Sequence, residues 1–97
     1  MNTPIEKNVI TKRINKIFLQ KFNVDLFGIN EKYYMDDNIL DKKFNLYARD
    51  LLYLVYDLEQ EFDIKITSED LDEIRLNTVR NIILLIQKKS NMEEVSI

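Results

Sequence analysis

Hydrophobic residues recur every three or four positions near the start of the chain. The stripe consists of Ile5, Val9, Ile10, Ile14, Ile17 and Phe18. Because an α-helix turns once in 3.6 residues, side chains at this spacing share one face. Thr3 suits a helix cap, Pro4 suits the first helical position, and Glu6 can complete a capping box. The pattern predicts a helix over residues 3–22.

Between residues 23 and 44 the helical period is lost. Gly28 and the turn-prone Asp36-Asp37-Asn38 cluster lie in this segment. It is nevertheless rich in large apolar and aromatic residues, namely Leu26, Phe27, Ile29, Tyr33, Tyr34, Ile39 and Leu40. We therefore expect a long loop held over the core rather than a free linker.

The strongest helical pattern covers residues 46–62. Leu51, Val55, Leu58 and Phe62 keep the spacing of a buried face, and Leu52 and Leu54 flank it. This segment is apolar around much of its circumference. We expect it to be the central helix.

Two more helices are expected in the C-terminal third. Thr67 and Asp70 have the spacing of a capping box for a short helix over residues 68–74. Thr78 suits the cap of a last helix, whose apolar residues are Val79, Ile82, Ile83 and Ile86. Residues 1–90 are then one domain and residues 91–97 a flexible tail. The order predicts an all-α four-helix bundle, with three longer helices, one short helix and a long loop between the first two.

The composition agrees with a small helical domain. The chain has 97 residues, of which 45% are hydrophobic and 32% charged, and it contains one glycine and one proline. Multi-stranded sheets need more turn residues than this. The net charge of −3 disfavours nucleic acid as a partner and favours a basic protein surface. We expect a monomer.

The chemistry available to the chain is narrow, because it contains neither histidine nor cysteine. This excludes the commonest general base, thiol nucleophiles and the usual transition-metal ligands, so we expect neither catalytic residues nor a metal site. Asp36, Asp37, Asn38 and Asp41 lack the alternation and the closing glutamate of an EF-hand loop and suggest a solvated loop. No apolar run has the length of a signal peptide or a membrane span, so a cytoplasmic protein without membrane contact is expected.

Several segments, in order, resemble the acyl carrier proteins. Residues 3–9 look like the opening of the first helix of that family. Residues 57–66, with the sequence Asp-Leu-Glu-Gln-Glu-Phe-Asp-Ile-Lys-Ile, look like the end of its second helix and the connector that follows. Residues 67–70 are similar to its acidic third-helix start, and Thr78-Val79 to the start of the fourth. The resemblance implies a four-helix acyl-carrier fold over most of the chain, apart from the loop and the tail.

Active members of that family attach phosphopantetheine to a serine in an Asp-Ser-Leu motif at the start of the second helix. Counting back from Phe62 without gaps places this motif on Tyr47-Ala48-Arg49. Ala48 therefore occupies the serine position, and its methyl group cannot form a phosphodiester. Because no serine precedes Thr67, a shift of register cannot supply one. The resemblance thus implies a degenerate member without the prosthetic group or any other cofactor.

The same resemblance implies that partners bind along the second helix. Asp50 and Glu59 keep acidic charge there, whereas Tyr47 and Tyr53 stand where carriers often have acids. With Arg49, these residues form the expected partner-binding set. The tyrosines, and Tyr56 with them, either contact a partner or pack against the loop.

Three functions are open. The leading hypothesis is a non-enzymatic module that docks onto a biosynthetic or peptide-modifying enzyme, since the chain is similar in length and in its missing serine to acyl-carrier-related proteins of peptide maturation systems. The second is a genuine acyl or aminoacyl carrier with an atypical attachment site. The third is a small bundle that binds a lipid or acyl chain directly.

Overall fold

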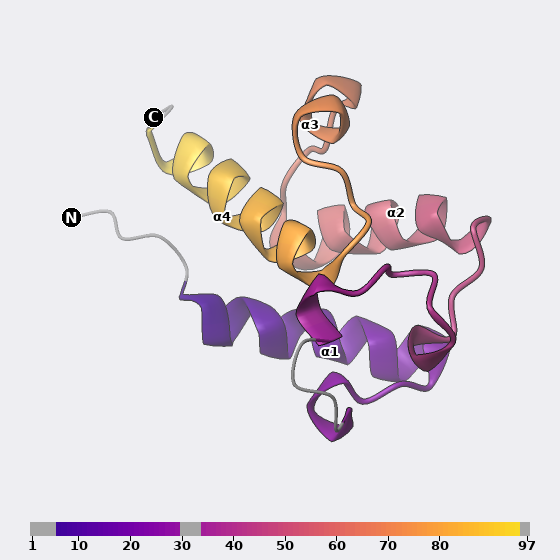
Figure 1. Ribbon diagram of the computed structural model, residues 1–97. Coiled ribbons are helices and arrows are strands. Elements are labelled where there is room, and N and C mark those ends of the chain that lie inside the picture. Colours follow the sequence, from indigo (N-terminus) through magenta and orange to yellow (C-terminus); the bar gives the residue numbers. More distant parts are fainter. Residues whose placement is uncertain (1–5, 30–33, 96–97) are drawn as a thin grey trace.

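The structure is a computed structural model that describes residues 6–29 and 34–95, with side chains described through residue 90. It contains four α-helices: α1 (Lys7–Phe22), α2 (Asp50–Phe62), α3 (Ser68–Glu73) and α4 (Val79–Val95). Three single 3₁₀ turns lie between α1 and α2: η1 (Leu26–Gly28), η2 (Tyr34–Asp36) and η3 (Lys42–Phe44). No strand occurs in the described ranges, so the predicted all-α four-helix fold is confirmed (Figure 1).

The core lies where α1, α2 and α4 meet. Its fully buried residues include Ile10, Ile14, Phe18, Leu26, Phe44, Leu54, Leu58, Val79, Ile82, Leu85 and Ile86. Phe18 stands at an aromatic centre, edge-on to Phe22 and Phe44 with ring centroids 5.5 and 6.3 Å away. This core fastens the end of the long loop to α1 as well as joining the helices.

The loop is held over the core, as predicted, although part of its apolar surface faces solvent. Leu26 and Ile39 are buried, whereas Phe27 and Leu40 are exposed. The Ile39 N–H donates to the Asn77 carbonyl at 2.7 Å, which joins the loop to the start of α4. Tyr33 lies outside the described residues.

Two predicted helix starts are wrong. Glu6 is the N-cap residue, with an extended backbone and no side-chain cap bond, so α1 begins at Lys7 and Glu6 does not occupy the third helical position that the predicted capping box requires. Thr3 and Pro4 lie outside the described residues. Helix α2 begins at Asp50 rather than at residue 46, because Asn45 takes a left-handed conformation that ends η3 and residues 46–49 form the connection.

The other helix boundaries follow local side-chain chemistry. Asn23 and Asp63, both left-handed, end α1 and α2, in keeping with the tolerance of Asn and Asp for positive φ. Thr67 and Asp70 form the predicted capping box of α3. The Thr78 hydroxyl accepts the Asn81 N–H at 3.0 Å, as expected for the cap of α4.

The last helix is longer than predicted, since α4 continues through Val95 and covers most of the segment expected to be a tail. The separation of a 1–90 domain from a 91–97 tail stays a prediction. Within the described part of the chain, none of the helices combines the length and apolarity required to cross a bilayer.

Candidate functional site: the start and outer face of α2

Ala48 lies in the turn that leads into α2. Its carbonyl accepts the Leu51 N–H at 3.2 Å, and the Tyr47 carbonyl accepts the Asp50 N–H at 2.8 Å. Asp50 returns a bond, since its carboxylate accepts the Tyr47 N–H at 2.9 Å. Hydrogen bonds between Tyr47 and Asp50 thus close the turn at the start of α2, and Ala48 lies within this turn.

Arg49 completes the start of the helix. Its guanidinium lies over the Tyr47 ring, 5.2 Å from the centroid, and both side chains are exposed. Such stacking leaves the guanidinium N–H groups able to donate outward. Among the described residues, Arg49 forms no ion pair.

The outer face of α2 is aromatic and aliphatic. Tyr47, Tyr53 and Tyr56 expose 65%, 69% and 59% of their surface, which favours the alternative of partner contact over packing against the loop. Leu52 was expected beside the buried face but is 80% exposed. The helix instead buries Leu54, Leu58 and Phe62, with Leu51 and Val55 only partly covered.

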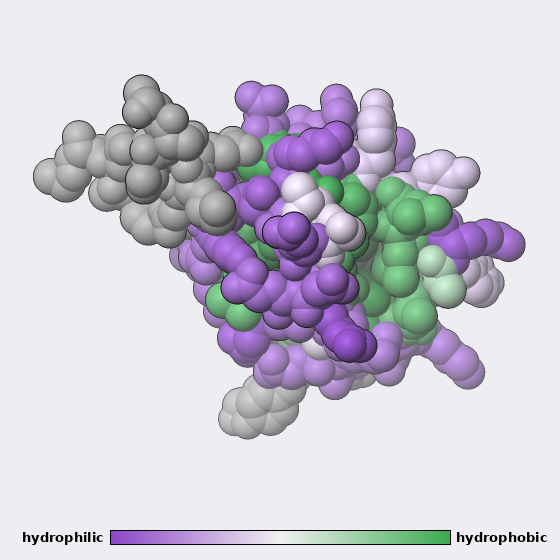
Figure 2. Space-filling view, turned by 90° about the horizontal axis from the view of Figure 1, so that it is seen from above, coloured by the Kyte–Doolittle hydropathy of each residue, from purple (hydrophilic) through white to green (hydrophobic). Residues whose placement is uncertain are grey.

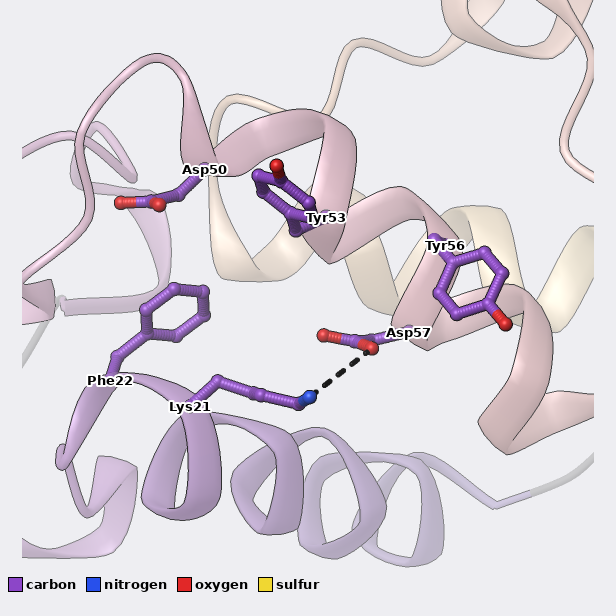
Figure 3. A pocket seen from close by; sticks show the side chains of 6 residues that line it. All are labelled: Lys21, Phe22, Asp50, Tyr53, Tyr56 and Asp57. Atoms are coloured by element: carbon purple, nitrogen blue, oxygen red, sulfur yellow. Dashed lines mark ion pairs between the residues drawn. The ribbon is translucent and has the colours of Figure 1, made fainter.

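A hollow of about 380 Å³ lies between the end of α1 and the outer face of α2 (Figure 3). Lys21 and Phe22 line it from α1, and Asp50, Tyr53, Tyr56 and Asp57 line it from α2. The Lys21 ammonium lies 3.9 Å from the Asp57 carboxylate across it. Neither Lys21 nor Asp57 was among the predicted site residues, because only the packing of α1 against α2 brings them together.

Glu59 stands apart from the other predicted partner contacts. It is partly buried, and its carboxylate accepts the Ile66 N–H of the connector at 2.8 Å. This bond satisfies a backbone donor that precedes α3. The structure therefore brings Tyr47, Arg49, Asp50 and Tyr53 together. Glu59 instead binds the connector that precedes α3.

Glu61, near the end of α2, is bound by two basic residues of α1. Its carboxylate lies 2.7 Å from the Lys16 ammonium and 2.9 Å from Arg13 Nε. The hydrogen bond from Lys16, together with that from Arg13, holds the pKa of Glu61 below its ordinary value despite the opposing effect of burial. This group joins α1 to α2 and is not a free recognition charge.

The acidic cluster of the loop is also used internally. Asp36 is paired with Arg80 at 2.6 Å and Asp37 with Lys43 at 2.5 Å. Asn38 and Asp41 accept backbone N–H groups two residues ahead. Within residues 6–29 and 34–90, no group of three or more potential metal-binding side chains is found.

Comparison with known proteins identifies the family. The chain is 36% identical over 81 residues to the acyl carrier protein of Buchnera aphidicola subsp. Acyrthosiphon pisum (strain Tuc7), covering 84% of this chain and 92% of that relative. It is 33% identical over 84 residues to the acyl carrier protein of Buchnera aphidicola subsp. Schizaphis graminum (strain Sg), covering 86% and 96%. The chain belongs to the acyl carrier protein family. No family model and no solved structure matches it.

Membership agrees with the resemblance seen in the sequence and with the four-helix architecture. Acyl carrier proteins are in general non-catalytic carriers that interact with partner enzymes, and a chain without histidine or cysteine is consistent with that class.

Proposed function

We propose that this acyl carrier protein family member is a non-catalytic docking module that carries no phosphopantetheine arm. The observation that carries the proposal is the alanine at position 48, directly before α2. A phosphodiester requires an oxygen on the side chain, and a methyl group supplies none. The residues at this end of α2 do not fit a serine-linked prosthetic group.

No other aliphatic hydroxyl lies near position 48 in the sequence. Residues 12–66 contain neither serine nor threonine. Thr67 is occupied in the capping box of α3, Thr78 caps α4, and Ser90 is buried on α4. These positions support a chain that acts through its surface.

The exposed aromatic residues of α2 support a docking role. Tyrosine provides a large contact area with few rotatable bonds, and aromatic and arginine residues are enriched among energetically important contacts at interfaces. Tyr47, Arg49 and Tyr53 are all exposed around the start of the helix. The proposed partner is a biosynthetic or peptide-modifying enzyme, by similarity to the carrier-related proteins of peptide maturation systems.

Co-expression with a phosphopantetheinyl transferase of broad specificity tests the missing arm. We expect the intact mass of the purified chain to equal that of the polypeptide alone. A serine-bearing acyl carrier protein expressed with the same transferase is the positive control. A mass gain that matches phosphopantetheine would overturn the proposal in favour of a carrier with an atypical attachment site.

A matched variant of this chain sharpens the result. The triple substitution Tyr47→Asp, Ala48→Ser and Arg49→Leu restores the Asp-Ser-Leu motif on exposed residues of the same turn. Modification of the triple variant but not of the native chain would assign the difference to these three side chains. Peptide mapping that located phosphopantetheine on any residue of the native chain would contradict the arm-free function.

A further inference from the structure

Two hollows lie on the outer side of α2 and share one leucine. The first, of about 730 Å³, is lined by Arg49, Leu52, Tyr53 and Tyr56. The second, of about 280 Å³, lies between α2 and the α3 region and is lined by Leu51, Leu52, Val55, Leu71, Arg75, Leu76 and Asn77. Figure 2 shows hydrophobic side chains gathered beside a hydrophilic area on the upper face. We name Leu52, Tyr53, Tyr56, Leu71 and Leu76 the leucine–tyrosine band.

One arginine lines each hollow. Arg49 is in the first and Arg75 in the second, and both are exposed. Neither forms an ion pair within the part of the chain that the structure describes. The guanidinium is weakly hydrated and binds carboxylates in a two-pronged geometry. The band thus presents an apolar surface with two cations available to an incoming anion.

The acidic residues of α2 have partners inside the molecule. The Asp50 carboxylate accepts the Tyr47 N–H, and that of Glu59 accepts the Ile66 N–H. Asp57 is paired with Lys21, and Glu61 with Arg13 and Lys16. Two exposed acids of α3, Glu69 and Asp72, line neither hollow. The charged side chains that line the two hollows are therefore both arginines, Arg49 and Arg75.

We propose that the leucine–tyrosine band binds an acidic amphipathic segment of a partner protein, with apolar side chains on the band and carboxylates on Arg49 and Arg75. This inference rests on the proposed docking function and specifies the chemistry of its partner. A second copy of the chain fits less well, because the carboxylates of its α2 would have to leave their internal partners to reach the arginines. Apolar burial supplies most of the affinity, and the arginines set the orientation.

Selection from a random peptide library displayed on phage tests the proposal with the full chain as bait. We expect selected peptides to combine apolar residues at helical spacing with Asp or Glu, and to bind the purified chain in fluorescence anisotropy. Leu52→Asp should weaken binding by about tenfold or more, as for a central interface contact. The matched control Leu84→Asp changes an exposed leucine of α4 and should leave the affinity unchanged.

Charge reversal tests the role of the arginines. The double variant with Arg49→Glu and Arg75→Glu should bind the acidic peptide at least about tenfold more weakly and regain affinity for a peptide whose acids are replaced by lysine. Lys12→Glu, on an exposed position of α1, is the control for a change of net charge. Circular dichroism of each variant verifies that the helices are intact.

Three outcomes would overturn the inference. They are the selection of basic peptides that bind through Glu69 and Asp72, the absence of any selected peptide, and concentration-dependent dimers in sedimentation that Leu52→Asp abolishes. The mass measurement is independent of all three. A chain that gains the arm but still selects acidic peptides would refute the arm-free function alone, and an unmodified chain that selects none would refute the partner chemistry alone.

Discussion

Lys89 of α4 forms an ion pair with Asp70 of α3, with 3.0 Å between the ammonium nitrogen and a carboxylate oxygen. Both side chains are largely shielded from solvent, with 13% and 10% of their surface exposed. The same carboxylate accepts the Thr67 N–H at 2.9 Å in the capping box. One acidic group therefore both starts α3 and fastens this short helix to α4.

This double role predicts a pH-dependent contribution to stability. Burial raises the pKa of Asp70, but bonds from the Thr67 N–H and hydroxyl and from Lys89 more than offset it, so the pKa lies below its ordinary value of 3.8. A lowered pKa means that the folded state favours the carboxylate. The stabilisation is complete above the unfolded-state value and is lost as pH falls through the lower folded-state value.

Asp70→Asn should lower the free energy of unfolding near neutral pH by about 1–2 kcal/mol, because it removes the charge from a shielded pair. Urea unfolding followed by circular dichroism measures the difference at a series of pH values. We expect the two proteins to converge below pH 3.8. Asp72→Asn, at an exposed position of the same helix, is the control, and an equal effect of both substitutions would contradict the assignment.

Two neighbouring leucines of α2 provide a test of its register. Leu54 is fully buried, whereas Leu52 is 80% exposed. Leu54→Ala should destabilise the fold by about 2–5 kcal/mol, since it leaves a cavity in the core. Leu52→Ala should change stability by no more than about 0.5 kcal/mol. If thermal and urea unfolding showed a similar loss of stability for Leu54→Ala and Leu52→Ala, the helix would bury a different face.

Asn15 anchors the start of the long loop from within α1. Its buried side-chain carbonyl accepts the Leu26 N–H at 2.7 Å, and its amide donates to Asp25 at 3.0 Å. Asn15→Ala leaves the buried N–H without this partner and should lower the free energy of unfolding by about 1–3 kcal/mol. Hydrogen exchange should then be faster at the Leu26 amide. Unchanged exchange there, with Gln20→Ala as the surface control, would contradict the anchoring role.

Arg13 joins α1 to the end of α2 by three contacts. It donates from Nε to the Glu61 carboxylate at 2.9 Å and from a second nitrogen to the Glu61 carbonyl, and it lies over the Phe62 ring, 4.4 Å from the centroid. Arg13→Ala should destabilise the fold by about 1–2 kcal/mol, and Arg13→Lys should recover only part of this, because lysine lacks the planar fork. Lys12→Ala, one residue earlier and exposed, should have little effect in the same unfolding assay.

Much of the helical architecture could be predicted because it depends on contacts within a few residues. The period of three and four positions identified α1 and α4, and Thr67 with Asp70 identified the start of α3, since a capping box is made by residues three apart. The start of α2 was predicted four residues too early. The apolar pattern continues through Leu46, and the tolerance of asparagine for positive φ was not enough to show that the chain would turn at Asn45.

The candidate site likewise combines features that the sequence determined with features that only the folded structure determined. The absence of a serine near α2 is a property of the sequence alone, and so is the cluster of Tyr47, Arg49 and Tyr53 at adjacent turns. Only the tertiary structure decided that Leu52 faces solvent and Leu54 the core, because α2 is apolar around much of its circumference and its orientation depends on where α1 and α4 pack. It also decided that Glu59 and Glu61 bind internal partners, since Ile66, Arg13 and Lys16 approach them only when the chain is folded.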